Sequence, residues 1–455
     1  MSDTSVRIDL PANRLERQIP DLKPPLSEAS ALAEANRCLY CYDAPCIQAC
    51  PTAINIPEFI KRIATGNTKG AAKTILESNI LGHSCARVCP VEVLCAGACV
   101  YNDKEEPPIM IGRLQRYATQ YAYDRNLQFF KKGAPTGRKI ALVGGGPASV
   151  AAAHELTRLG HACTVLEGRA TPGGLNTTGV APYKLHAEDS LEEIAYVQQI
   201  GFEIKTNTWV GKDVAIESLL ADYDAVFLGI GLGADSRLGI PGEDTPGCTG
   251  AVAWIERMKN EPSYKLEGVT HAVVVGGGNT AIDVARELLH LGVPCVSMAY
   301  RRDEKDMSGY VHELAAAKKE GVRLEFRLQP KAVVGGDRVT GMTFQVVKPG
   351  EGGKLVPVEG AEVTLPAELV VVATGQEKLE AFVKAIPGVG FEKGRVVADK
   401  RTGATGHPKV FAGGDCANGA KEVVNAAAEG KVAALGIDAY FQTLSQPQEI
   451  SVIIK

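Results

Sequence analysis

Eight of the twelve cysteines of this chain lie in one segment, between Cys38 and Cys99. They form two runs, "CLYCYDAPCIQACP" (38–51) and "SCARVCPVEVLCAGAC" (84–99), and the first run has the spacing C-x2-C-x4-C-x3-C-P. Cysteines this close together either form disulfides or hold a metal as thiolates. The compartment and the rest of the chain decide which chemistry applies.

Composition favours a cytoplasmic protein. The 455 residues suggest about three domains. Lys+Arg is 49 and Asp+Glu is 53, a net charge of −4 without the basic excess that nucleic-acid binding needs. No apolar run reaches the roughly 18 residues of a membrane span. The polar start "MSDTSVRIDLPANRLERQ" lacks the apolar region of a secretory signal. Because a reducing compartment disfavours disulfides, the clustered cysteines are predicted to be metal ligands.

Iron–sulfur clusters fit the cysteine spacing better than zinc does. Eight thiolates would suit two 4Fe-4S clusters with four ligands each. In the bacterial two-cluster run, the cysteine before the proline ligates the other cluster, and Cys50 precedes Pro51 here. Crossed ligation is therefore expected. The alternative is a pair of four-thiolate zinc sites, for which C-x4-C-x3-C-P is an unusual spacing.

Two strand–turn–helix–strand units follow the cysteine segment. After the linker "KKGAPTGRK" (131–139) comes "KIALVGGGPASVAAAHELTRLGHACTVLEGR" (139–169), and a second copy, "AVVVGGGNTAIDVARELLHLGVPCVSMAYRR", covers 272–302. The tail holds an apolar strand in "ELVVVATG" (368–375) and a strand, Gly-Asp turn and helix in 409–434. Two such units predict two nucleotide sites, or one site and one relic.

The first unit carries a dinucleotide fingerprint. Gly144 permits a tight turn, and Gly146 lets a pyrophosphate approach the backbone at the start of a helix. Ser149 occupies the third glycine position. Glu167 ends the second strand, where an acid binds ribose hydroxyls. A chance glycine turn is the alternative, but strand, helix and acid are all in register.

The second unit lacks that acid. Ala299 stands where the glutamate would be, and Arg301 and Arg302 follow it. Two guanidiniums could hold a 2′-phosphate, which favours NADPH. Since Asp303 and Glu304 come next, a solvated arginine pair is the alternative, and the choice between NADH and NADPH stays open.

Two dinucleotide folds, the second inserted in the first, with Gly414-Asp415 near the end, resemble the two-dinucleotide-binding flavoproteins. The resemblance implies FAD in the first fold and NAD(P)H in the inserted fold, with hydride passing to the flavin. Members that act on disulfides carry a cysteine pair beside the flavin. Cys295 is the only cysteine between 251 and 364, and Cys163 has no close partner, so a thioredoxin-reductase type is not expected.

The predicted fold class is α/β, with an N-terminal helical iron–sulfur domain and two Rossmann-like domains. Residues 1–132 are expected to bind two 4Fe-4S clusters. Residues 138–250 and 365–455 are expected to form the FAD domain, and 251–364 the inserted NAD(P)H domain.

This order of domains resembles the small subunit of glutamate synthase and the N-terminal half of dihydropyrimidine dehydrogenase, from about Leu26 to Gln442. The details are more similar to the dihydropyrimidine dehydrogenase branch, including its bacterial two-subunit form. They are "CLYCYDAPCIQACP", "GAAKTILESNILGHSCARVCP", the C-x5-C-x3-C spacing, "IGRLQRYAT" and "GGGPAS". The glutamate synthase branch tends toward a tighter C-P-x-x-C spacing and a glutamate near Gln115.

That branch implies an unusual ligand set. One cluster would take Cys38, Cys41, Cys46 and Cys99, and the other Cys50, Cys89, Cys95 and the amide oxygen of Gln115. Counting thiols alone favours Cys85 over Gln115, and Gln115 could instead be an ordinary residue on the helix surface. Only the resemblance favours Gln115 over Cys85 as the eighth ligand.

The resemblance also implies the nucleotide contacts. FAD would meet Gly144, Gly145, Gly146, Pro147, Ala148, Glu167, Gly174, Leu175, Lys184, Val210, Gly414, Asp415 and Val423. NAD(P)H would meet Gly277, Gly278, Asn279, Thr280, Arg301, Arg302, Ala373, Thr374 and Gly375. Ser308 replaces a basic residue of the phosphate-binding pattern, which weakens the case for NADPH.

The pyrimidine-reducing half of that family is an FMN-binding barrel of about 250 residues, and this sequence, ending at Lys455, has no stretch for it. We therefore expect an electron-input subunit (EC 1.3.1.-), with no catalytic side chain assigned, in a hetero-oligomer with an FMN partner that reduces uracil or thymine. Alternatives are input to a glutamate synthase large subunit or a bifurcating transhydrogenase. A further alternative is a scaffold whose clusters only brace an assembly.

Overall fold

The structure is a computed structural model that describes residues 10–445. The predicted segments 1–132 and 365–455, and the polar N-terminal stretch, therefore lie partly outside the described residues. No helix among the described residues is long and apolar enough to cross a membrane.

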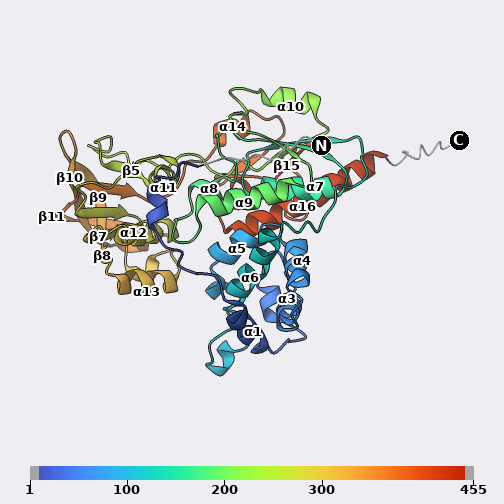
Figure 1. Ribbon diagram of the computed structural model, residues 1–455. Helices are drawn as coiled ribbons and strands as arrows, with labels where there is room; N and C mark the ends of the chain where they lie inside the picture. Colours follow the sequence, from blue (N-terminus) through green and yellow to red (C-terminus); the bar gives the residue numbers. More distant parts are fainter. Residues whose placement is uncertain (1–9, 446–455) are drawn as a thin grey trace.

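Short helices form the N-terminal domain, which lies below the rest of the molecule in Figure 1. Their amphipathic pattern builds its core, since α3 buries apolar side chains at helical spacing: Ile56, Phe59, Ile60 and Ile63. The elements are α1 (Glu28–Asn36), α2 (Pro45–Gln48), α3 (Ile56–Ala64), α4 (Thr68–Ser78), α5 (Gly82–Val88), η2 (Val91–Val93), η3 (Asn102–Lys104) and α6 (Ile111–Asp124), and the short helix η1 (Leu15–Gln18) precedes them.

The first sheet domain has five parallel strands in the order β15-β4-β1-β2-β3. Its strands β1 and β4 are almost wholly buried, as parallel strands covered on both faces are. The strands are β1 (Lys139–Val143), β2 (Ala162–Leu166), β3 (Glu203–Lys205), β4 (Ala225–Leu228) and β15 (Val410–Ala412). The helices are α7 (Pro147–Arg158), α8 (Leu175–Thr178), α9 (Ala187–Gln198), α10 (Ile216–Asp222), α14 (Glu380–Lys384), α15 (Asp415–Asn418) and α16 (Val423–Ser445), and a small ribbon joins β13 (Phe391–Glu392) to β14 (Arg395–Val396).

The second sheet domain is inserted between β4 and β15 and has the parallel order β5-β12-β6-β7-β8. An antiparallel meander, β9-β10-β11, extends from it. The strands are β5 (Cys248–Gly250), β6 (His271–Val275), β7 (Cys295–Tyr300), β8 (Arg323–Phe326), β9 (Leu328–Gly335), β10 (Val339–Pro349), β11 (Leu355–Pro366) and β12 (Leu369–Val372). The helices are α11 (Ala251–Asn260), α12 (Asn279–His290), η4 (Glu304–Asp306), α13 (Val311–Glu320) and η5 (Glu351–Gly353).

The inserted sheet extends beyond the segment 251–364 that the sequence predicted. Both β5 and β12 lie outside that segment, yet β12 pairs with β5 on one side and with β6 on the other. The chain leaves the sheet for the meander and returns through β12. Because "LVVV" (369–372) is apolar throughout, either buried parallel sheet would accept it, and the pattern alone could not assign it.

The first described residues also differ from the prediction, which placed them in the helical domain. Leu15 and Ile19 are buried against Trp254 and Met258 of α11, in the core of the inserted domain. Figure 1 shows η1 in dark blue beside α11. The N-terminal segment therefore connects the helical domain to the inserted domain.

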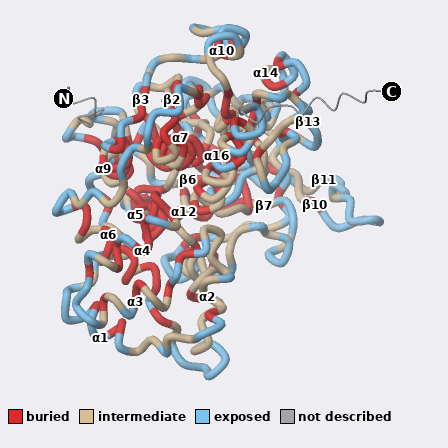
Figure 2. Tube along the Cα trace, turned by 90° about the vertical axis from the view of Figure 1, so that its right-hand side faces the viewer, coloured by how far each residue is buried: buried red, intermediate tan, exposed pale blue. Residues whose placement is uncertain are grey.

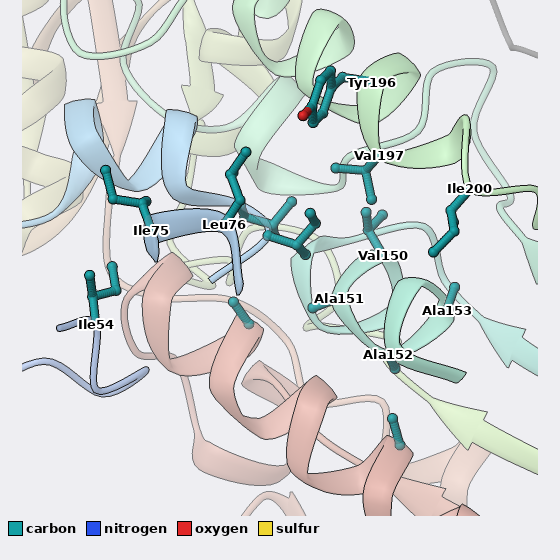
Figure 3. Close-up of a cluster of buried hydrophobic side chains, with 14 of the residues drawn as sticks. Ile54, Ile75, Leu76, Val150, Ala151, Ala152, Ala153, Tyr196, Val197 and Ile200 are labelled. Atoms are coloured by element: carbon teal, nitrogen blue, oxygen red, sulfur yellow. The ribbon is translucent and has the colours of Figure 1, made fainter. Parts of the chain in front are cut away.

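One continuous core joins the helical domain to the first sheet domain. Figure 3 shows Ile75 and Leu76 of α4 near the α7 side chains Val150 and Ala151, with Val197 of α9 beyond them, and all belong to one buried cluster. Figure 2 marks the buried stretches of α4, α5 and α7 in red. The cysteine segment is thus held firmly against the first nucleotide fold.

Candidate functional site: two cysteine pockets and two nucleotide turns

The structure brings four cysteines of the two runs around one cavity. This first cysteine pocket is lined by Cys38, Cys41, Cys46 and Cys99. Its other walls are largely apolar and include Ile60 of α3. Cys50 is not among its lining residues, although it belongs to the same sequence run as Cys46. The grouping therefore crosses between the runs.

The remaining cysteines surround a second pocket, which Cys50, Cys85, Cys89 and Cys95 line together with Gln115. The Gln115 amide nitrogen donates to the carbonyl of Gly82 at 2.7 Å. Since the nitrogen is held there, the amide oxygen is the group that remains free to face a metal. Both candidates for the eighth ligand, Cys85 and Gln115, lie at this second cysteine pocket.

The cysteines of both pockets are soft sulfur donors of the kind that iron–sulfur clusters use. Burial raises the pKa of Cys46 to about 11 and that of Cys95 to about 12. A hydrogen bond from the Cys89 thiol to Cys85, together with burial, holds the pKa of Cys89 well above its usual value. Thiols with such pKa values ionise near neutral pH only when a cation binds them. All twelve cysteines are free, so no disulfide competes for them.

The first glycine turn lies between β1 and α7 as the sequence predicted. Gly144 has φ +89°, a conformation that favours glycine. The Gly145 N–H donates to a Glu167 carboxylate oxygen at 2.7 Å, and the Arg169 N–H donates to the other at 2.7 Å. Helix α7 starts after Gly146 without a side-chain cap. Its first N–H groups can therefore receive a pyrophosphate.

Two further loops close around this turn. The loop of Gly174 and Leu175 lies against Gly146, because a Cβ on Gly174 would be 3.0 Å from the Gly146 Cα. Gly414, before α15, donates its N–H to Glu429 at 2.7 Å. Burial raises the pKa of the neighbouring Asp415. Pro147, Ala148, Gly174, Leu175, Gly414 and Asp415 thus belong to segments near one another.

Three predicted flavin residues lie at the edges of this region. Val210 follows Thr208, whose N–H donates to the Glu167 carbonyl at 2.8 Å. Lys184 forms ion pairs with Asp283 at 2.7 Å and Glu313 at 2.9 Å, so its ammonium faces the inserted domain. The third, Val423, begins α16.

The second glycine turn opens into a cavity of about 730 Å³. The cavity reaches from the inserted domain to the first sheet domain, where it is bounded by Lys378, Gly419 and Ala420. Predicted residues that line it are Gly277, Gly278, Thr280, Arg301, Ala373, Thr374 and Gly375. This cavity therefore extends along the boundary between the two sheet domains.

Two predicted contacts do not line the cavity. Arg302 lies outside its wall. The Asn279 amide oxygen instead accepts the Tyr310 N–H at 2.8 Å. The carboxylate of Asp303, which follows the arginine pair, accepts a hydrogen bond from the Arg327 guanidinium at 2.7 Å. Arg301 is therefore the one member of the pair that faces the cavity.

Sequence reasoning missed two cations of the cavity. Arg237 and Lys378 both line it, from loops that carry no motif. Lys378 directly follows "ATGQE", and that segment does not predict a cation in the cavity. Both come close to the second turn only through folding, so spacing in the sequence could not reveal them.

The start of α16 links the nucleotide region to the cysteine pockets. Val424 lines the second cysteine pocket, directly after the predicted flavin residue Val423. Ile56 lines both cysteine pockets, so the two share a wall. The two cysteine pockets thus adjoin each other, and the second of them lies beside the start of α16.

Comparison with known proteins identifies the two kinds of domain in the chain. Residues 15–127 match the family described as dihydropyrimidine dehydrogenase domain II, 4Fe-4S cluster. Residues 138–430 match the family described as pyridine nucleotide-disulphide oxidoreductase. The chain thus contains a 4Fe-4S domain followed by an oxidoreductase domain of the flavin and nicotinamide type.

Two curated relatives are similar along almost their whole length. The glutamate synthase (NADPH) small chain of Escherichia coli K12 is 36% identical over 95% of this chain and 96% of its own. The NAD-dependent dihydropyrimidine dehydrogenase subunit PreT of the same organism is 34% identical over 94% and 98%. Among solved structures, Mycobacterium tuberculosis FprA in complex with NADPH has TM-score 0.55 at 21% identity, over 67% of this chain and 85% of that one, which shows a shared fold.

Proposed function

Because this chain belongs to the pyridine nucleotide-disulphide oxidoreductase family, among the NAD(P)H-dependent flavin and iron–sulfur oxidoreductases, we propose that it is the electron-input subunit of a dihydropyrimidine dehydrogenase. Bound NAD(P)H would supply hydride, FAD would accept it, and two 4Fe-4S clusters would carry single electrons to an FMN-containing partner. No side chain of this chain is assigned a catalytic role.

One observation carries the proposal: the two cysteine pockets share Ile56, and the start of α16, next to the predicted flavin residue Val423, lines the second of them. The start of α16 separates the flavin region from the second pocket, and Ile56 separates the second pocket from the first. Centres held at these positions would be neighbours, as a one-electron path requires.

The residues at the pockets suggest how each centre is held. The first cluster would be bound by Cys38, Cys41, Cys46 and Cys99, all at the first pocket. The second would be bound by Cys50, Cys89 and Cys95 with either Gln115 or Cys85, all at the second. Gln115 is preferred because the Gly82 carbonyl fixes its amide nitrogen, so that the oxygen is presented.

The two glycine turns would orient the nucleotides. Helices α7 and α12 both begin without a side-chain cap, so their N–H groups are available to a pyrophosphate. Glu167 would accept the FAD ribose hydroxyls while the Gly145 N–H steadies it. At the second turn Arg301 would meet a 2′-phosphate without Arg302, and the preference between NADPH and NADH is left to experiment.

The choice of partner rests on sequence motifs. "IGRLQRYAT" and the cysteine spacing favour an acceptor that reduces uracil or thymine at the 5,6 double bond. The second candidate is the small subunit of glutamate synthase, favoured by 36% identity over 95% of the chain. A bifurcating transhydrogenase partner is a further alternative, and a hetero-oligomer is common to all three.

A purified complex would distinguish these acceptors. The chain serves as bait in its native host under anaerobic conditions, and oxidation of NADH and of NADPH is followed on adding uracil, or 2-oxoglutarate with glutamine. We expect a co-purifying FMN protein and uracil-dependent oxidation. Turnover only with 2-oxoglutarate and glutamine would instead establish the second candidate. Reduction of uracil by the isolated chain would contradict the electron-input role.

A further inference from the structure

Glu193 of α9 is a carboxylate buried between the helical domain and the first sheet domain, with 1% of its surface exposed. The backbone N–H groups of His83 and Ser84 donate to its Oε1 at 3.0 and 3.1 Å. The Ser84 hydroxyl donates to Oε2, and the Tyr123 hydroxyl of α6 lies 3.4 Å from Oε1. Leu81, at the cap position of α5, offers no side-chain acceptor. Glu193 therefore caps α5 from another domain.

Helix α5 is the segment that carries Cys85 and ends at Cys89, both at the second cysteine pocket. Ser84, which Glu193 holds, directly precedes Cys85. A displacement at the start of this short helix would therefore move the ligands of that pocket.

The same serine reaches the flavin region. The Asn176 amide donates to the Ser84 hydroxyl oxygen at 2.8 Å and to Ser190 at 3.3 Å. Asn176 lies in α8, the helix that begins directly after Gly174, and Gly174 lies against the first glycine turn. An unbroken set of hydrogen bonds thus joins α8, through Ser84, to Glu193.

We propose that Glu193 is a positioning residue for electron transfer between the flavin and the second cysteine pocket. Its carboxylate fixes Ser84, and through Ser84 it holds α5 and α8 in one arrangement. This inference deepens the proposed function and rests on it. Glu193 touches neither nucleotide nor cysteine, and acts only through the groups it holds.

The charged surroundings give Glu193 a distinctive pH response. Burial raises its pKa to about 7, against the hydrogen bonds from Ser84 and His83 and the charge of Arg87. Arg87 is itself paired with Asp189 of α9 at 3.1 Å. The other titratable groups that face this region are His83 of α5, Arg116 and Tyr123 of α6, and Glu192 and Tyr196 of α9. Burial keeps His83 neutral, because it holds the pKa of that imidazole well below its usual value.

The charge of Glu193 determines how the reduction potential of the second cluster depends on pH. Above about pH 7 Glu193 is negative, and a negative charge near the second pocket disfavours the arrival of an electron. The reduction potential of the second cluster should therefore fall as the pH rises through 7 in the wild-type chain. Glu193→Gln keeps the shape of the side chain and removes its charge. In that variant the reduction potential of the second cluster should therefore stay constant over the same pH range.

Two measurements on the full chain with its cofactors test the proposal. EPR-monitored redox titrations at pH 6, 7 and 8 report the potential. Rapid mixing with NADH or NADPH reports flavin reduction and cluster reduction separately. In Glu193→Gln we expect roughly tenfold slower cluster reduction with flavin reduction unchanged. Glu192→Gln is the matched control, since it removes a neighbouring carboxylate that makes no bond to Ser84, and it should behave as wild type.

A third measurement does not depend on the cofactors. Hydrogen exchange of the His83 and Ser84 amides should be roughly fivefold faster in Glu193→Gln, since one accepting charge is lost. Should that variant fail to fold, Ser84→Ala breaks the same connection and should slow cluster reduction likewise. A pH-dependent potential that persists in Glu193→Gln, or cluster reduction at the wild-type rate, would overturn the inference. Wild-type clusters that never accept electrons would instead overturn the proposed function, while the amide exchange result would stand.

Discussion

Single residues decide how the second cysteine pocket would hold a cluster. Cys85 and Gln115 both line this pocket. Their spacing in the sequence does not show which of the two is the eighth ligand. Thiol counting favours Cys85, whereas the hydrogen bond from Gln115 to the Gly82 carbonyl presents the amide oxygen. Gln115 is also nearly buried, at 7% exposure, so a plain surface role does not fit it.

Replacing each residue separately would identify the eighth ligand. With Gln115 as ligand, Gln115→Ala should reduce the iron content from about eight to about four per chain, since one 4Fe-4S cluster is lost. Cys85→Ser should keep about eight irons and both cluster EPR signals. Iron and sulfide analysis of anaerobically purified protein measures this. Loss of a cluster in Cys85→Ser, with both retained in Gln115→Ala, would reverse the assignment.

At this scale the sequence identified many of the residues that line the cysteine pockets and the cavity. Dense cysteine spacing and the two glycine turns are local signals, and the structure brings those residues together. The exceptions are instructive. Arg302 follows Arg301 directly but lies outside the cavity, while Arg237 and Lys378 line it from loops that carry no motif. Side-chain direction and long-range contacts are set by tertiary packing, which no local pattern encodes.

Among the elements, α16 has the most consequence for the nucleotide site. It lies against α7 so closely that a Cβ on Gly430 would be 2.1 Å from the Ala148 carbonyl oxygen. Ala148 belongs to the first turn of α7, where a pyrophosphate would bind. A side chain at Gly430 must therefore push α16 away from the FAD region.

Gly430→Ala should weaken FAD binding by roughly tenfold, which corresponds to about 1.4 kcal/mol. The cause is the displaced contact, since backbone carbonyls give way less easily than side-chain ends. Flavin content after gel filtration and a fluorescence titration of the apoprotein with FAD measure the effect. Gly336→Ala is the control, because a Cβ there meets nothing within 4 Å. Equal FAD affinity in the two variants would show that the contact does not matter.

The order of elements was predictable, but two boundaries were not. The spacing of apolar residues and the positions of the glycine turns identified both βαβ units. The strand "LVVV" belongs to the inserted sheet rather than to the segment after it, because hydrogen bonding to β5 and β6 decides its place. Likewise, Leu15 and Ile19 pack into the core of the inserted domain. The N-terminal segment has few apolar residues, and their pattern did not predict this contact.

Considered as a whole, the molecule is held together by buried polar contacts between its domains. Lys259 of α11 is buried and donates to the carbonyls of Val180 and Leu185 in the first sheet domain at 2.9 and 2.8 Å. Glu287 of α12 is buried beside the Tyr183 N–H, at 3.5 Å. These contacts fix the inserted domain relative to the first, and so fix the cavity between them.

Burial raises the pKa of Glu287 from 4.5 to about 8. The folded chain therefore binds more protons at this group than the unfolded chain does, over the interval from about pH 4.5 to pH 8. Its contribution to stability is fully present below that interval and is lost as the pH rises through 8. Glu287→Gln should make the melting temperature less dependent on pH between 6 and 9. Melting curves of variant and wild type that run parallel across that range would contradict this.

The central claim is that one chain carries electrons from NAD(P)H through flavin to two clusters. The most direct test mixes the isolated, cofactor-loaded chain anaerobically with NADH or NADPH, and follows flavin absorbance and cluster EPR together. The account predicts that flavin bleaching is followed by the EPR signals of two reduced clusters. Bleaching of the flavin while both clusters stay oxidised, with their iron and sulfide intact, would contradict it and favour the scaffold alternative.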